Sequence, residues 1–217
     1  MGVLKMTPPG SRGGKTWDFS RFDRALVYAS QLHAKQRRKG GDIPYLGHLL
    51  GVASIVLDYG GNEDEAIAAL LHDAIEDQGG EATRQEIRRR FGDQVTDIVN
   101  GCTDDDQVPK RPWGLRKRAY IARLRHEPQS VLLVSAADKL HNARAVLADY
   151  RVMGDLLWNR FTGGKEGTLW YYRELVKAYR EAGAPAALTE ELDRVVAELE
   201  RLAGMERSRE SKVESRE

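Results

Sequence analysis

The stretch Ala68–Asp77 (AALLHDAIED) constrains the fold more than any other, because an apolar run there delivers four ionisable side chains within six residues. His72 and Glu76 are four residues apart. Asp73 and Asp77 have the same spacing, so one continuous helix would place each pair in a column on the same side. Three carboxylates packed this closely resist burial unless a cation or solvent compensates them. The apolar neighbours predict a buried helix, which favours a functional site over a solvated helix end.

Composition limits the function classes that need to be considered. The length of 217 residues suits a single domain, and 34 Lys plus Arg against 33 Asp plus Glu give a net charge of +1. No charge excess therefore indicates nucleic-acid or membrane binding. The single cysteine, Cys102, excludes an internal disulfide and a multi-cysteine zinc site, and is expected to be buried. Without a membrane-spanning run or a signal-peptide core, we expect a cytoplasmic protein.

Apolar residues recur at helical spacing along most of the chain, and no segment shows the strict alternation of a strand. The sequence therefore predicts an all-α single domain over residues 17–203. A flexible arm (1–16) is expected before it and a disordered charged tail (204–217) after it. The helices are expected at roughly 20–38, 46–57, 63–77, 83–90, 95–99, 115–124, 131–147, 167–182 and 189–202. Thr83 and Glu86 resemble a capping box that opens the fourth of these.

Four polar positions interrupt apolar helices: His48, the His72–Asp73 pair and Asp138. Two imidazoles and two carboxylates suit a borderline divalent cation such as Mn²⁺, Fe²⁺ or Zn²⁺ better than Mg²⁺ or Ca²⁺. Four protein ligands on a metal that accepts six leave room for water and a substrate oxygen. Glu76 and Asp77 could then hold or deprotonate that water. Spacing alone does not show that His48 and Asp138 converge on the pair.

Two basic clusters flank these positions. Arg37–Lys39 precedes the first histidine of the metal pattern. After the acidic residues of the polar loop 103–112 come Lys110, Arg111, Arg116, Lys117 and Arg118. In a nearly neutral chain such clusters suit a polyphosphorylated small molecule, although a solvated helix face explains the second equally well. His33 lies on an apolar helix face and is interpreted as a packed core histidine. Trp170–Tyr172 is likewise interpreted as core packing.

The pattern of His48, His72–Asp73 and Asp138 resembles the HD superfamily of metal-dependent phosphohydrolases. The resemblance is closer to the guanosine tetraphosphate (alarmone) hydrolases: the hydrolase domain of the RelA/SpoT enzymes and the stand-alone small alarmone hydrolases. The fold that it implies is an HD-type bundle of α-helices. The matching stretches are Gln36–Lys39, Pro44–His48, Ala69–Asp77, Phe91–Gly92 with Val95, Thr103–Asp105 and Ala137–Arg144.

The resemblance implies a role for each matching residue. The metal ligands, most often for Mn²⁺ in this branch, would be His48, His72, Asp73 and Asp138. The acidic pair that positions the attacking water would be Glu76 and Asp77. The substrate-binding residues would be Arg38 and Lys39 on the base, Asn142 near the sugar and phosphates, and Lys110 on a phosphate. His126 and His141 receive no catalytic role, although His141 lies within a matching motif.

Two positions depart from the family pattern: Leu49, where proline usually follows the first metal histidine, and Ala145, where threonine is frequent. Both leave the metal positions intact and leave the identity of the nucleotide open. The sequence therefore predicts a manganese-dependent phosphohydrolase that removes pyrophosphate from the 3′ position of guanosine tetra- or pentaphosphate. The alternatives are another nucleotide (an adenine alarmone, the 2′-phosphate of NADPH or a nucleoside monophosphate) or a non-catalytic nucleotide-binding HD module. Nucleic-acid binding is the least favoured function.

Overall fold

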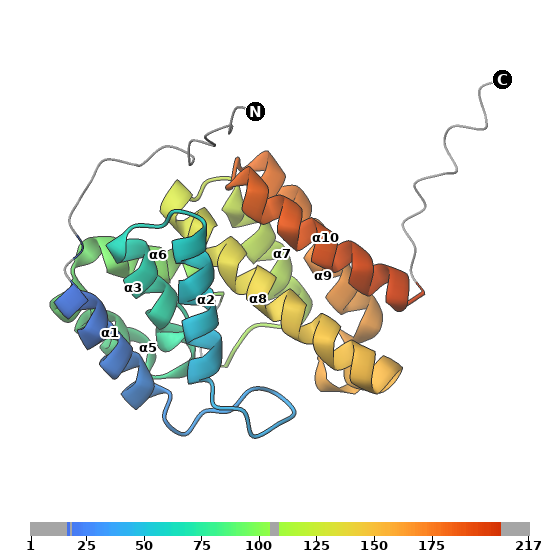
Figure 1. Cartoon of the computed structure of the whole chain (residues 1–217), viewed down its shortest axis with the longest axis horizontal. Coiled ribbons are helices and arrows are strands. Elements are labelled where there is room, and N and C mark those ends of the chain that lie inside the picture. Colours follow the sequence, from blue (N-terminus) through green and yellow to red (C-terminus); the bar gives the residue numbers. More distant parts are fainter. Residues whose placement is uncertain (1–16, 18, 105–108, 205–217) are drawn as a thin grey trace, which may run out of the picture.

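The computed structural model describes residues 17, 19–104 and 109–204, which form helices joined by short loops (Figure 1). Within these residues there is no strand, so the all-α prediction is confirmed, and no helix has the length and apolarity to cross a bilayer. The predicted arm, and all of the predicted tail except Gly204, lie outside the described residues. The elements are α1 (Phe19–Leu32), α2 (Leu46–Asp58), α3 (Glu63–Leu71), α4 (Ala74–Asp77), α5 (Gly80–Phe91), α6 (Asp93–Cys102), α7 (Trp113–Leu124), α8 (Gln129–Met153), the 3₁₀ helix η1 (Gly154–Arg160), α9 (Gly164–Glu181) and α10 (Ala186–Leu202).

Helix α8 is the central element of the bundle. It packs against α2, α3 and α6 on one side and against α9 and α10 on the other, and it runs between these two groups in Figure 1. Its segment from Val131 to Asp138 is buried without interruption, as expected of a helix that is covered all round. The buried Asp138 therefore sits in the middle of the molecule, next to the helices that carry the two histidines.

The first helix ends earlier than predicted. α1 stops at Leu32, whereas the apolar spacing predicted a helix to about Arg38. The following segment forms its own hydrogen bonds instead: the Arg38 N–H donates to the Ile43 carbonyl (2.9 Å) and the Tyr45 N–H to the Gln36 carbonyl (3.1 Å). These bonds fold residues 33–45 into a loop that presents the first basic cluster beside α2.

The predicted central helix is broken at the candidate ligands. α3 ends at Leu71 and α4 begins at Ala74, with His72 and Asp73 in the turn between them. Asn62 and Glu65 form a capping box at the start of α3. On a regular helix neighbouring side chains point about 100° apart, so a continuous helix could not aim His72 and Asp73 at one point. The prediction of one continuous helix over residues 63–77 is therefore wrong, although the Asp77 N–H still donates to the Asp73 carbonyl at 3.0 Å, the helical spacing expected for that pair.

Two further details differ from the prediction. α5 begins at Gly80, and Thr83 lies inside it with its hydroxyl donating to the Gln78 carbonyl (2.8 Å), so the predicted capping box is wrong. The 3₁₀ helix η1 was not predicted. Its position is fixed by buried Leu157 and Trp158. The helices expected around residues 46–57, 95–99, 115–124, 131–147, 167–182 and 189–202 are present as α2, α6, α7, α8, α9 and α10.

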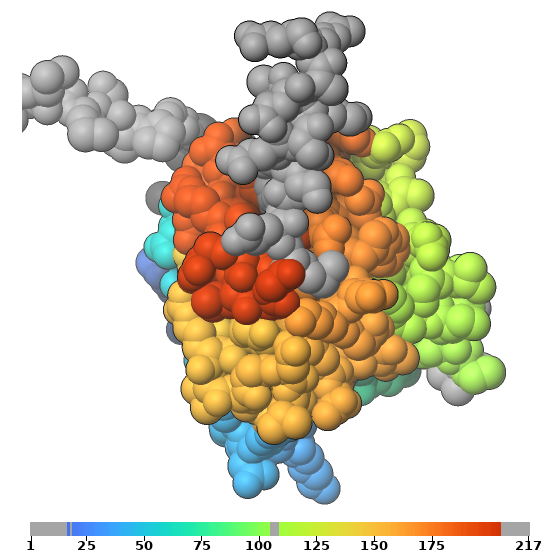
Figure 2. Space-filling view, turned by 90° about the vertical axis from the view of Figure 1, so that its right-hand side faces the viewer, coloured from blue at the N-terminus to red at the C-terminus, as the bar shows by residue number. Residues whose placement is uncertain are grey.

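The loop that carries Arg38 rests on η1. Gly40 has a φ of +82°, and the Arg160 guanidinium lies so close that a Cβ at residue 40 would be 2.4 Å from its Nε. Arg160 is itself paired with Asp149 of α8 at 3.3 Å. In the space-filling view the blue atoms of this loop project below the yellow C-terminal part of α8 (Figure 2). The loop is therefore supported by an element far along the chain.

Candidate metal centre

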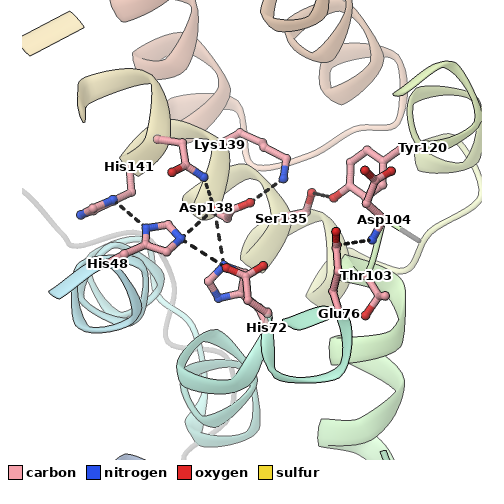
Figure 3. A network of polar contacts seen from close by, with 12 residues as sticks. His48, His72, Glu76, Thr103, Asp104, Tyr120, Ser135, Asp138, Lys139 and His141 are labelled. Carbon is pink, nitrogen blue, oxygen red and sulfur yellow. Dashed lines mark hydrogen bonds and ion pairs between the residues drawn. The ribbon is translucent and has the colours of Figure 1, made fainter. Parts of the chain in front are cut away.

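Four side chains from three places in the chain converge on one point. Figure 3 labels three of them: His48, His72 and Asp138. The Nε2 atom of His48, from α2, lies 3.2 Å from Asp138 Oδ1 and 3.6 Å from Asp73 Oδ2. The Nε2 atom of His72 lies 3.0 Å from Asp73 Oδ2 and 3.5 Å from Asp138 Oδ1. Donor atoms about 2.1 Å from one ion and at right angles to each other lie about 3.0 Å apart. The observed spacings are close to those of neighbouring ligands around a single cation.

The protonation of the two imidazoles also fits a cation. Nδ1 of His72 lies 2.8 Å from the Ala69 carbonyl oxygen, which can only accept, so this nitrogen carries the hydrogen. In the neutral form of the ring the Nε2 atom then presents a lone pair to the centre. Among the described residues neither this atom nor Nε2 of His48 has a hydrogen-bond partner, although both are buried. Because unsatisfied buried polar atoms are costly, the donor set fits a divalent cation.

A second layer of residues orients these four, and the sequence did not assign it. The Tyr45 hydroxyl donates to Asp73 Oδ2 and the Lys139 ammonium to Asp138 Oδ2, both at 2.5 Å. His141 meets His48 through their Nδ1 atoms at 2.9 Å. His141 touches a candidate ligand rather than the centre itself. This contact is compatible with the expectation that His141 has no catalytic role. One sequence feature did point to Tyr45, Lys139 and His141: all three lie inside the stretches that match the alarmone hydrolases.

Opposite charges hold the group together. Burial disfavours the charged form of His72, but the carboxylates of Asp73 and Asp138 outweigh it and raise its pKa well above the usual value. Burial would raise the pKa of Asp138, but the Lys139 ammonium and His72 outweigh it and hold that pKa well below the usual range. Protons and a cation therefore compete for the same buried site.

Glu76 and Asp77 are held by different parts of the chain. Glu76 Oε1 accepts from the Lys110 ammonium at 2.7 Å. Its Oε2 accepts from the Asp104 backbone N–H at 3.3 Å, as Figure 3 shows. Asp77 Oδ2 instead accepts from Gln36 Nε2 at 2.8 Å. Desolvation and the nearby Asp73 carboxylate raise the pKa of Asp77. The two carboxylates adjoin the centre in different environments.

The predicted substrate-binding residues differ in how directly they are linked to the centre. Arg38 donates to Asn142 Oδ1 (2.8 Å), and Asn142 Nδ2 donates to Asp138 Oδ1 (2.5 Å), so both residues are linked to the centre by hydrogen bonds. Lys110 reaches the site through Glu76. Lys39 is exposed in the loop beyond Arg38.

Part of the second basic cluster has a structural role. Arg116 and Lys117 both bond to Asp104 Oδ2, at 2.5 and 2.8 Å. The Arg118 guanidinium lies 5.0 Å from the ring centroid of Trp170, which is only partly buried. Tyr171 and Tyr172 are buried, as the packing interpretation expects. Arg116 and Lys117 thus hold Asp104, whose backbone N–H donates to Glu76.

Comparisons with known proteins agree with this geometry. The chain is 43% identical to the guanosine-3′,5′-bis(diphosphate) 3′-pyrophosphohydrolase MESH1 of Xenopus tropicalis over 130 residues, which is 56% of this chain and 70% of that protein. It is 38% identical over 131 residues to a probable GTP pyrophosphokinase of Mycobacterium leprae, covering 59% of this chain but only 16% of that much longer protein.

The fold agrees as well. A solved structure, described as a metazoan ortholog of SpoT that hydrolyzes ppGpp, superposes with a TM-score of 0.70 and 27% identity, covering 88% of this chain and 99% of that one. The HD domain family matches residues 25–155, which is more than half of the chain and contains every candidate site residue. The chain therefore belongs to the HD domain family.

Proposed function

We propose that the protein is a metal-dependent phosphohydrolase that releases pyrophosphate from the 3′ position of guanosine-3′,5′-bis(diphosphate), ppGpp. One observation carries the proposal: two imidazoles and two carboxylates meet around one point in a chain similar to MESH1. The Arg38–Asn142 pair joins this point by hydrogen bonds and provides cationic recognition for a phosphorylated nucleotide.

The residues that would hold the cation are His48, His72, Asp73 and Asp138. Mixed nitrogen and oxygen donors favour Mn²⁺, with Fe²⁺ or Zn²⁺ as alternatives. When bound, the cation supplies Lewis acidity at phosphorus and makes a coordinated water a stronger acid. The chain's own contribution is to fix the donors: the Ala69 carbonyl and His141 orient the imidazoles, and Tyr45 and Lys139 orient the carboxylates.

Glu76 and Asp77 would hold the attacking water and take its proton. Glu76 is fixed by two donors, Lys110 and the Asp104 N–H, so its carboxylate is already oriented before substrate arrives. A positioned general base contributes about 10²–10⁴-fold to such a reaction. Asp77 is fixed separately through Gln36.

The substrate would lie across Arg38, Lys39, Asn142 and Lys110. A guanidinium plane can stack on a base and also pair with phosphate, and the Arg38 guanidinium lies 5.7 Å from the ring centroid of Tyr45. The Lys110 ammonium is a point charge suited to phosphate oxygens. Because it now pairs with Glu76, a bound phosphate would share or replace this contact. This function needs neither a membrane nor a nucleic acid, and cytoplasmic placement remains a prediction.

The decisive experiment is a nucleotide panel with purified protein and Mn²⁺. We expect pyrophosphate and GDP in equal amounts from ppGpp. Release of pyrophosphate from an adenine alarmone, or of phosphate from the 2′ position of NADPH or from a nucleoside monophosphate, with ppGpp untouched, would reassign the substrate. Binding without any turnover would support a non-catalytic nucleotide-binding module instead.

A further inference from the structure

A hydrogen-bonded chain outside the metal centre connects the buried His33 to Asp77. His33 Nδ1 lies 2.6 Å from Gln36 Oε1, and Gln36 Nε2 donates to Asp77 Oδ2 at 2.8 Å. The amide of Gln78 also donates to Gln36 Oε1, at 2.6 Å. His33 is only 2% exposed and comes from the segment directly after α1. The histidine interpreted as core packing is thus buried, but it is also the end of a polar chain.

The direction of each bond follows from donor chemistry. An ionised carboxylate only accepts, so the Gln36 amide must turn its Nε2 toward Asp77. Its Oε1 then faces the opposite way and accepts from both His33 and Gln78. Nδ1 of His33 lies 2.6 Å from this oxygen and 3.5 Å from Gln78 Nε2. Because the short contact is with an acceptor, Nδ1 carries the hydrogen, which leaves Nε2 as a lone pair.

The surroundings of His33 agree with this assignment. Within the described residues its Nε2 atom is buried and has no partner, and burial lowers the pKa of the ring, which keeps it neutral. The ring stacks on Tyr45 with centroids 5.4 Å apart and planes inclined by 19°. Tyr45 in turn donates to Asp73. His33 is therefore held in place by the same layer that orients a candidate metal ligand.

We propose that His33 and Gln36 are positioning residues that fix the carboxylate of Asp77. A glutamine amide rotates freely when only one end is bonded. Two donors on Oε1 stop this rotation, so Nε2 stays aimed at Asp77. The early end of α1 serves this arrangement, because the loop brings Gln36 across to a residue 41 positions away. The part of the proposal that concerns catalysis rests on the proposed hydrolase function, whereas the bond directions do not.

The bond directions can be tested without activity. In the full chain freed of paramagnetic metal, nitrogen NMR with labelled histidine should show His33 protonated on Nδ1 and bare on Nε2 at neutral pH. In Gln36→Met, which keeps the length of the side chain but has no amide, the Nδ1 proton signal should shift or exchange away. A ring protonated on Nε2, or an unchanged signal in the variant, would overturn the proposed chain of bonds.

The positioning role is tested by kinetics. Gln36→Met should lower kcat about tenfold or more while KM and bound Mn²⁺ stay near wild type, since small misplacements of a reacting group are costly. His33→Asn retains a donor near the position of Nδ1 and should keep most of the rate. The kcat of His33→Leu should fall to that of Gln36→Met. The kcat of the double variant should be no lower, because the two residues act as one unit.

Controls separate this role from a general loss of structure. Gln85→Met and His126→Asn change exposed residues of the same types elsewhere and should leave kcat unchanged. The positioning role would be overturned if Gln36→Met kept the wild-type kcat, or if its loss of kcat were explained by lost metal. Both outcomes can be read from Gln36→Met even if His33→Leu fails to fold. If the wild type turns over no nucleotide in the panel, the proposed function fails, and the NMR result still decides the hydrogen-bonded chain.

Discussion

Each imidazole at the centre is fixed by what its second nitrogen contacts. The Ala69 carbonyl fixes His72, and the neutral ring of His141 fixes His48. If Nε2 of His48 serves as a ligand, its Nδ1 carries the hydrogen and donates to a bare Nδ1 of His141. The hydrogen-bond partner of each Nδ1 atom thus decides whether the Nε2 lone pair faces the centre.

At this scale, Glu76→Gln should keep bound Mn²⁺ and lose about a hundredfold in rate, because the amide cannot accept a proton. The variant keeps the size of the side chain and an oxygen for Lys110. Metal analysis beside steady-state kinetics on the same preparation is the measurement. Turnover near wild type would remove Glu76 from the mechanism.

Acid sensitivity is expected from His141. Burial, His48 and Arg38 lower the pKa of its ring from 6.5 to about 4. The folded chain therefore binds fewer protons at this residue than the unfolded chain does, and stability falls as the pH drops from about 6.5 toward 4. His141→Gln keeps an acceptor for His48 and should flatten this decline. The comparison is of urea midpoints for the two metal-free proteins across this range, and parallel curves would contradict it.

Among the elements, α2 and α8 pack closely beside the centre. A Cβ at Gly51 would lie 2.3 Å from the His141 ring, so glycine allows the two helices to place His48 against His141. Gly51→Ala should destabilise the protein by about 1–3 kcal/mol through overpacking and weaken Mn²⁺ binding. Gly47→Ala, on the same helix with nothing within 4 Å, is the matched control. Equal unfolding midpoints for the two variants would refute the close-packing argument.

The sequence predicts where a helix begins and ends only when the interactions that fix those ends are local. Periodicity alone located α2, α7 and α10, since each buries one apolar face. The end of α1 and the break after Leu71 depend on bonds to distant residues, which no local pattern contains. The four candidate ligands were recognisable as polar interruptions in apolar helices. The roles of Tyr45 and Gln36 could not be assigned from the sequence, although both residues lie in stretches that match the family. These roles depend on which faces of separate elements meet.

For the molecule as a whole, the centre joins α8 to one of the two helix groups that flank it, through α2 and the turn between α3 and α4. A cation that binds only the folded chain stabilises it by RT ln(1 + [L]/Kd), about 2.7 kcal/mol at a hundredfold excess over Kd. For a chain of this size Mn²⁺ should therefore raise Tm by about 5–10 °C, and a chelator should reverse the rise. Asp138→Ala should lose the rise and turnover together, whereas Asp97→Ala, exposed on α6, should keep both. If Mn²⁺ raised the Tm of Asp138→Ala as much as that of the wild type, the ion would bind elsewhere.

The contact between Arg160 and Gly40 has a consequence for how such a protein can diverge. Arg160 lies outside residues 25–155, the part shared with the HD family, yet it underpins the loop that carries Arg38. Changes in the length or sequence of η1 can therefore re-aim Arg38, the arginine proposed to bind the base, while every candidate metal ligand stays untouched. Nucleotide preference can drift in this way without a loss of chemistry, and a chain trimmed at residue 155 would keep the donors but release the loop.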